Sequence, residues 1–205
     1  MFGLFKKKAK QTKVQDKIWT SNTGRDTGFV ADIKSALDQN KKVIVLFFFK
    51  DTGVTLEKLL TNNGIDLEHS KLHIFNAKDA DNSMSASSKI ADQMNENHLV
   101  LAYEHHPHKS KEALVFEAIY NKALVHETPC FYLSLDDPIM QVFGSERMKK
   151  MMTQMGTGVN ECIEHSMITS SVERAQRKLE EKTLNAFDKN SQEEWFKTNV
   201  EDYQD

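Results

Sequence analysis

An uninterrupted apolar run at residues 43–49 is the feature that most constrains how this chain of 205 residues can fold. The run contains only valine, isoleucine, leucine and phenylalanine, with no alternation of apolar and polar side chains. A strand with one face in water alternates, whereas a strand covered on both faces does not. The run therefore predicts a strand inside a parallel sheet that has helices on both faces.

Three further apolar runs, at residues 72–75, 98–103 and 131–135, are separated by segments with helical periodicity. The helical stripes are Phe29, Ile33, Ala36 and Leu37; Leu56, Leu59 and Leu60; and Ala113, Phe116, Ile119, Tyr120 and Ala123. Strands that alternate with helices predict an α/β fold of stacked βα units, with a mainly parallel sheet of about four or five strands.

From Asp137 onward the pattern is helical, and C-terminal helices should follow the sheet. Asp137 suits an N-cap and Pro138 the first helical turn. Four methionines then share one helix face: Met148, Met151, Met152 and Met155. We interpret this row as part of an ordinary core rather than as an adaptable binding groove. A second stripe has a narrow apolar seam, so its helix should lie on the domain surface or project from it: Ile168, Val172, Ala175 and Leu179.

Composition excludes several classes of protein. The 27 basic and 30 acidic residues give a net charge of −3, so we expect no nucleic-acid binding driven by positive charge. No apolar run is long enough for a membrane-spanning helix. The two cysteines, Cys130 and Cys162, cannot build a disulfide framework. They fit a reducing compartment, and we expect a cytoplasmic protein.

The two ends of the chain carry opposite charge. Residues 1–17 hold six lysines and one aspartate, whereas residues 191–205 hold five acidic residues and one lysine, so we expect solvated tails. The apolar residues at positions 2–5 suggest weak contact of Met1–Lys17 with an anionic membrane surface as the alternative to a free basic tail. Between the tails we expect an α/β lobe at residues 18–137 and a helical extension at residues 138–190.

Motifs for binding phosphate are missing from the sequence. There is no Gly-x-x-x-x-Gly-Lys-Ser/Thr loop, and the glycine pair at residues 24–28 has no lysine, which favours a turn. There is also no glycine between Gly64 and Gly144, and no arginine between Arg25 and Arg147. A phosphoryl-transfer site in that span would lack its loop and the arginine that stabilises developing charge.

A histidine-rich segment, Glu104-His105-His106-Pro107-His108, follows the third apolar run. The imidazoles of His105, His106 and His108 could bind zinc or nickel. Neighbouring side chains on an extended chain point to opposite sides, however, and no fourth ligand is close in sequence. The spacing therefore favours a solvated loop over a metal site. Cys130 lies in an apolar run, and we interpret it as a packed thiol rather than a nucleophile.

Four segments in the second half of the chain carry a family resemblance. In order, they are Phe131-Tyr132-Leu133-Ser134-Leu135-Asp136-Asp137-Pro138, Phe143-Gly144-Ser145-Glu146-Arg147-Met148, Ile163-Glu164-His165-Ser166-Met167-Ile168-Thr169 and Ala175-Gln176-Arg177-Lys178-Leu179-Glu180. The series resembles the end of the second motor lobe of the preprotein translocase ATPase SecA and the start of its helical scaffold. A weaker match begins at Ile18-Trp19-Thr20, which looks like an opening strand, so the resemblance spans residues 18–182. It implies a RecA-like, P-loop-type lobe at residues 18–137.

The departures from this family bear most on function. The sequence holds no counterpart of the family's first motor lobe, with its phosphate loop and metal-binding acids, or of the second lobe's Gly-Arg-Gly-Thr-Asp motif. Lysines stand at residues 106–129, where the family's arginine-rich finger segment aligns. The resemblance therefore implies a stand-alone, degenerate relative that is not an enzyme, has no cofactor and neither hydrolyses nor tightly binds ATP.

We expect a pseudo-ATPase module that binds protein in the process of protein export, either the translocation machinery or a second copy as a homodimer. The helices between Ile139 and Glu181 should supply the contact surface, because the corresponding helices of the family contact neighbouring domains. Two alternatives stay open. One is a nucleotide sensor completed by another motor's phosphate-binding lobe. The other is a ligand- or metal-binding protein with its site at the carboxyl ends of the strands, near Lys50-Asp51-Thr52, Lys78-Asp79 and Glu104–His108.

Overall fold

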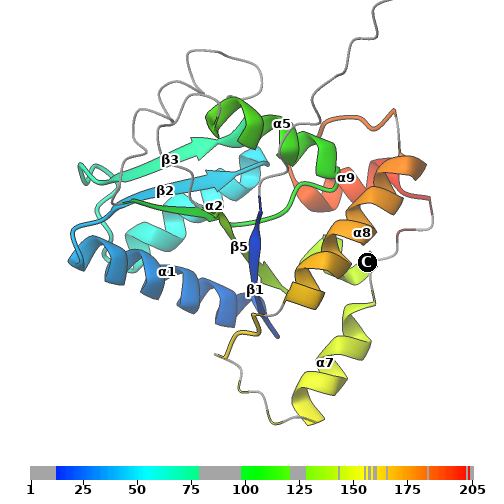
Figure 1. The fold of residues 1–205 in the computed structure, drawn as a ribbon, viewed down its shortest axis with the longest axis horizontal. Coiled ribbons are helices and arrows are strands. Elements are labelled where there is room, and N and C mark those ends of the chain that lie inside the picture. Colours follow the sequence, from blue (N-terminus) through cyan, green and yellow to red (C-terminus); the bar gives the residue numbers. More distant parts are fainter. Residues whose placement is uncertain are drawn as a thin grey trace, which may run out of the picture.

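The computed structural model describes residues 13–78, 98–120, 128–142, 144–154, 156, 158, 161–164, 166–183, 185–201 and 203. Its centre is a five-stranded parallel sheet with the order β1-β5-β4-β2-β3 (Figure 1). The strands are β1 (Gln15–Trp19), β2 (Lys42–Phe47), β3 (Leu72–Asn76), β4 (His98–Ala102) and β5 (Cys130–Ser134). The predicted α/β fold with a parallel sheet is confirmed.

Helices cover both faces of this sheet. The described helices are α1 (Asn22–Asp38), α2 (Lys50–Asn62), α5 (Lys109–Tyr120), α6 (Pro138–Val142), α7 (Ser145–Gln154), α8 (Ser166–Lys182) and α9 (Gln192–Asn199). Apolar side chains of α1 and α2 form the core on one face, and those of α5, α6, α8 and α9 form the core on the other.

Strand β2 is buried from both sides, as its apolar run predicted. Alternate residues of the segment 43–46 belong to the two opposite cores, and all four side chains are fully buried. The strand ends at Phe47, before the run does. It ends there because the next two N–H groups donate to the side chain of Glu104 instead of to a neighbouring strand.

The chain crosses between strands in two opposite directions. From β2 it passes through α2 to β3, toward one edge of the sheet. From β4 it passes through α5 to β5, toward the opposite edge. Because such crossovers are right-handed, α2 and α5 lie on opposite faces. The connections that leave the neighbouring strands β4 and β2 therefore diverge. This divergence makes a switch point at their carboxyl ends, the place where open α/β sheets bind ligands.

Residues 24–28 are not the turn that their glycines suggested, because they belong to α1. Ser21 caps this helix by accepting the N–H of Gly24 at 3.2 Å. Gly28 faces the indole ring of Trp19, and a Cβ atom at this position would lie 2.4 Å from the ring. The close approach of α1 to Trp19 thus explains the glycine.

The helices after residue 137 share the core of the sheet rather than forming a separate extension. Helix α6 begins at Pro138 as predicted, and α8 lies on the domain with Val172 and Leu179 buried. Met152 is buried in the core as interpreted, whereas Met148 is half-buried. Met155 and the side chain of Met151 lie outside the described residues.

The predicted acidic tail at residues 191–205 is wrong for most of its described part. Gln192–Asn199 form α9, with Trp195 and Phe196 buried in the core. Ser191 caps this helix by accepting the N–H of Glu194 at 3.1 Å. Acidic side chains in a first turn are favourable beside the positive end of the helix dipole. Two of the five acidic residues, Glu193 and Glu194, therefore belong to the start of a packed helix.

The predicted basic tail at residues 1–17 is too long, since β1 begins at Gln15. Residues 1–12, and with them the predicted membrane contact, lie outside the described residues. None of the helices that the structure describes is both long and apolar enough to cross a membrane.

Candidate functional site

The side chain of Glu104 occupies the switch point between β4 and β2. Its Oε1 accepts the N–H groups of Phe48 and Phe49 at 2.9 and 3.0 Å, and its Oε2 accepts the hydroxyl of Thr52 at 2.8 Å. These donors lie at the start of α2, where backbone N–H groups and the helix dipole favour an anion. The protein's own carboxylate thus takes the donors that a bound anion would need.

Burial controls the protonation of this carboxyl group. Glu104 is 7% exposed, and loss of hydration raises its pKa to about 7, although its three hydrogen-bond donors act to lower it. Near neutral pH the group therefore titrates between an ionised and a neutral form.

The carboxyl ends of β1, β5 and β4 meet around Arg25 of α1. Its guanidinium donates to Asp137 at 2.6 Å, to the hydroxyl of Tyr103 at 2.9 Å and to Asp26 at 3.1 Å. Burial acts to lower the pKa of Arg25, but Asp137 and Tyr103 more than offset this, and the pKa lies above its usual value. The one arginine in the first 146 residues is therefore bonded within the protein.

Sequence patterns assign no specific role to these two charged groups. Glu104 enters the sequence reasoning as part of the histidine segment and of the alternative ligand site at the strand ends. Arg25 enters it within residues 24–28 and as the border of a stretch without arginine. A usable signal for Glu104 is its place two residues after a buried strand, at the edge where ligands bind in α/β sheets.

The segment 104–108 is buried, so the expected solvated loop is wrong. His105, His106 and His108 are 0%, 3% and 8% exposed. Helices α8 and α9 cover them: Nε2 of Gln176 donates to the carbonyl of His106 at 2.7 Å, and Nε2 of Gln192 donates to that of His105 at 2.9 Å. Hydrogen-bond partners from distant parts of the chain make the burial of this polar segment possible.

The imidazoles of this segment are engaged in packing and hydrogen bonds. The two ring nitrogens of His105 lie 2.6 Å from Glu112 and 3.0 Å from Asp16. The ring of His106 stacks on Phe49, with the centroids 5.7 Å apart. Among the residues that the structure describes, no three histidine, cysteine or acidic side chains form a group that could hold a metal ion.

Neighbouring imidazoles in this segment differ in charge. Burial acts to lower the pKa of His105, but Glu112 and Asp16 raise it more, to about 9. Burial lowers the pKa of His106 to about 4. At neutral pH a charged His105 therefore bridges two carboxylates, and a neutral His106 packs among aromatic rings.

The segments that resemble the family hold packing positions. Five residues in and just after β5 are all buried: Phe131, Tyr132, Leu133, Ser134 and Leu135. Ile163 exchanges backbone hydrogen bonds with Ile18, at 2.8 and 3.1 Å, beside the edge strand β1. Ser145 and Gln176 are also buried, and Cys130 is a buried thiol whose pKa burial raises to about 12.

Other residues of these segments lie toward the surface. Gly144 adopts a left-handed backbone conformation with a φ of 80°, which glycine tolerates. Five described side chains are exposed, namely Glu146, Glu164, Ser166, Arg177 and Lys178. Phe143, His165 and the side chain of Arg147 lie outside the described residues.

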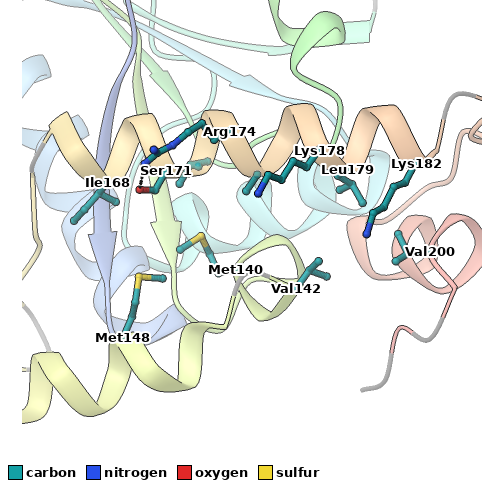
Figure 2. A pocket seen from close by; sticks show the side chains of 12 residues that line it. Met140, Val142, Met148, Ile168, Ser171, Arg174, Lys178, Leu179, Lys182 and Val200 are labelled. Atoms are coloured by element: carbon teal, nitrogen blue, oxygen red, sulfur yellow. Dashed lines mark hydrogen bonds between the residues drawn. The ribbon is translucent and has the colours of Figure 1, made fainter.

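Helices α6, α7 and α8, together with Val200 just after α9, line a groove of about 670 Å³ (Figure 2). Its lining includes Met140, Met148 and Leu179. Ala175 and Lys178, from the last family-like segment, also line it. The methionine residues of this row therefore differ in environment: Met152 packs in the core, and Met148 lines the groove.

Comparison with known proteins finds similarity over part of the chain. No family model matches it. The chain is 57% identical over 51 residues to the protein translocase subunit SecA of Christiangramia forsetii, and 55% identical over 51 residues to that of Flavobacterium psychrophilum. It is 49% identical over 57 residues to that of Acidithiobacillus ferrooxidans. These matches cover 25% to 28% of this chain.

The predicted resemblance to SecA is therefore confirmed over about a quarter of the chain, whereas its predicted extent over residues 18–182 stays a prediction. The chain spans only 5% to 6% of the length of the curated relatives that it matches. The parallel five-stranded sheet with helices on both faces is consistent with a RecA-like lobe.

Proposed function

We propose that this SecA-related chain is a non-catalytic pseudo-ATPase module that binds a protein of the translocation machinery. The observation that supports this most is the position of Glu104 at the switch point. An ATPase of this fold class uses the carboxyl edge of its sheet to hold the nucleotide. A chain that fills this place with its own side chain keeps the fold without the binding site.

Binding of a phosphate group at this edge would be unfavourable. Displacing the carboxylate of Glu104 from Phe48, Phe49 and Thr52 would leave a buried acid without donors. The guanidinium of Arg25 is engaged with its own carboxylate partners and offers no free fork for phosphate. The groups at this edge that could bind an anion are thus already bonded to carboxylates of the protein itself.

The relatives support the translocation machinery as the partner. They are named as subunits of a protein translocase, and a subunit works through contact with other proteins. We place the module in the cytoplasm, in line with its free thiols, Cys130 and Cys162.

Titration calorimetry of the full chain with magnesium ATP and with ADP, together with a phosphate-release assay, tests the proposal. We expect no binding tighter than about millimolar and no turnover, because the donors are occupied. Replacing Glu104 with alanine should allow weak binding of inorganic phosphate, whereas the exposed matched control Glu117→Ala should not. Micromolar nucleotide binding or steady turnover by the unmodified chain would contradict the proposal.

Binding of a purified translocation motor, measured by chemical cross-linking, tests the partner. We expect a complex that forms equally well with and without nucleotide. A complex that requires nucleotide would instead indicate a nucleotide sensor. Self-association without binding of the motor would indicate a homodimer.

A further inference from the structure

We propose that the groove between α6, α7 and α8 binds an amphipathic helix of a protein partner that carries acidic side chains beside its apolar face. This surface gives the proposed interaction module, on which the proposal rests, a binding site of defined chemistry. The partner helix would cover apolar side chains that the domain leaves open and would neutralise a row of cations.

The groove is lined by apolar side chains that the rest of the domain does not fully cover. Met140 and Leu179 are buried, whereas Met148, Ile168 and Val200 are half-buried around the opening. The volume of this groove, about 670 Å³, lies within the range of specific binding sites. Methionine side chains adapt their shape to different apolar partners. The lining therefore suits the apolar face of a helix.

Three cations stand on successive turns of α8 along the groove, at Arg174, Lys178 and Lys182 (Figure 2). Their spacing of four residues places them about 6 Å apart along the helix axis. All three are exposed, and within the described part of the chain none is in an ion pair. Lys17, by contrast, is paired with Asp32 at 2.8 Å. The row thus presents uncompensated positive charge to whatever fills the groove.

A helix fits this arrangement better than a flat surface does. From Ile168 to Lys182, α8 extends for about 21 Å, the length of about four helical turns. A helix laid beside α8 packs its side-chain ridges into the grooves of its neighbours. One acidic side chain per turn of the partner would then face one cation of α8. A lipid bilayer is too flat to fill a concave space between helices.

Two designed peptides of about 18 residues test the proposal by fluorescence anisotropy with the full chain. Both carry leucines on one helix face. One carries glutamates beside that face on each turn, and the other carries lysines at the same positions. We expect the acidic peptide to bind at least about tenfold more tightly than the basic one, because only its charges complement the row.

Charge reversal in the row gives the matched test. The double variant Lys178→Glu, Lys182→Glu should weaken binding of the acidic peptide about tenfold and make the basic peptide the better ligand. The double variant Lys34→Glu, Arg177→Glu changes the net charge by the same amount at exposed positions outside the groove, and it should alter neither affinity. Circular dichroism verifies that each variant keeps its helix content.

Equal binding of both peptides, or unchanged binding after reversal of Lys178 and Lys182, would overturn the proposal. So would binding of phosphatidylglycerol vesicles without binding of either peptide, or a dimer that the reversal dissociates. If the reversed variant still cross-links to the purified translocation motor as the unmodified chain does, only the groove assignment fails. If the unmodified chain hydrolyses ATP and does not bind the motor, the proposed function fails as well.

Discussion

Arg25 and Asp137 form a buried ion pair, with Nη1 of the arginine 2.6 Å from Oδ1 of the aspartate, although 112 positions separate them along the chain. Each of the two side chains is 9% exposed. The pair joins the first turns of α1 to the segment that follows β5, and Tyr103 joins it from the end of β4. Three strand ends are thereby fixed at the edge where a related enzyme would need an open site.

Replacing Asp137 with asparagine should lower the free energy of unfolding by about 3 kcal/mol, because the buried guanidinium loses its main charge partner. Urea denaturation followed by circular dichroism measures this change. Lys197→Gln breaks an exposed ion pair with Glu193, 2.8 Å apart on α9, and should change the free energy of unfolding by less than about 0.5 kcal/mol. An equally small effect of Asp137→Asn would show that the buried pair does not stabilise the fold.

Glu104 should make the protein less stable as the pH rises. Its pKa is about 7 in the folded protein, against an ordinary value of 4.5, so the folded state holds the proton more tightly. The stabilisation is complete below the ordinary pKa and is lost as the pH rises through the folded pKa. The Glu104→Gln variant lacks this titration. From about pH 4.5 to about pH 8, its free energy of unfolding should therefore rise relative to that of the unmodified chain by about 3 kcal/mol.

Denaturation curves of the two proteins at several pH values provide this measurement. The matched control is Glu117→Gln, which makes the same substitution at an exposed position of α5. A pH-independent difference for Glu104→Gln would mean that the buried carboxyl group does not titrate near neutrality.

The sheet could be predicted from the sequence because its signal is local. The run at residues 43–49 by itself indicates a strand buried on both faces, since none of its side chains is polar. Strand β1 has no such run, because Asp16 and Lys17 interrupt it, and only the family resemblance pointed to Ile18. Asp16 is nevertheless 1% exposed, because it pairs with His105, a contact that no local pattern contains.

The environment of the segment 104–108 could not be predicted because its partners are remote in sequence. The N–H group that Phe48 gives to Glu104 comes from 56 positions away, and the amide that Gln176 gives to His106 comes from 70 positions away. A polar segment without visible partners looks solvated. Burial became possible only when α8 and the sheet brought these donors to it.

Gly28→Ala should destabilise the fold by about 2 kcal/mol, because the new methyl group would overlap the indole of Trp19. Thermal unfolding measures the loss. Adding Trp19→Phe should recover part of it, since a smaller ring leaves room for the methyl group, and a double-mutant cycle gives the coupling. Gly64→Asn is the control, because that position has open space and a φ of 71° that asparagine tolerates. If the effects of Gly28→Ala and Trp19→Phe on stability were additive, the contact with the indole would not be the cause of the destabilisation.

Trp195→Ala should lower the free energy of unfolding by about 3 kcal/mol or more, because a large buried ring leaves a cavity that the core cannot refill. Trp195 is 1% exposed and packs edge-on against His108 with ring centroids 5.2 Å apart, so the loss should also loosen the buried histidine segment. Urea denaturation measures the stability, and hydrogen exchange at residues 104–108 measures the loosening. Phe187→Ala removes a ring that is 69% exposed and should cost less than about 0.5 kcal/mol. If the two variants were equally harmless, the acidic segment that holds Trp195 would be the solvated tail that its charge suggests.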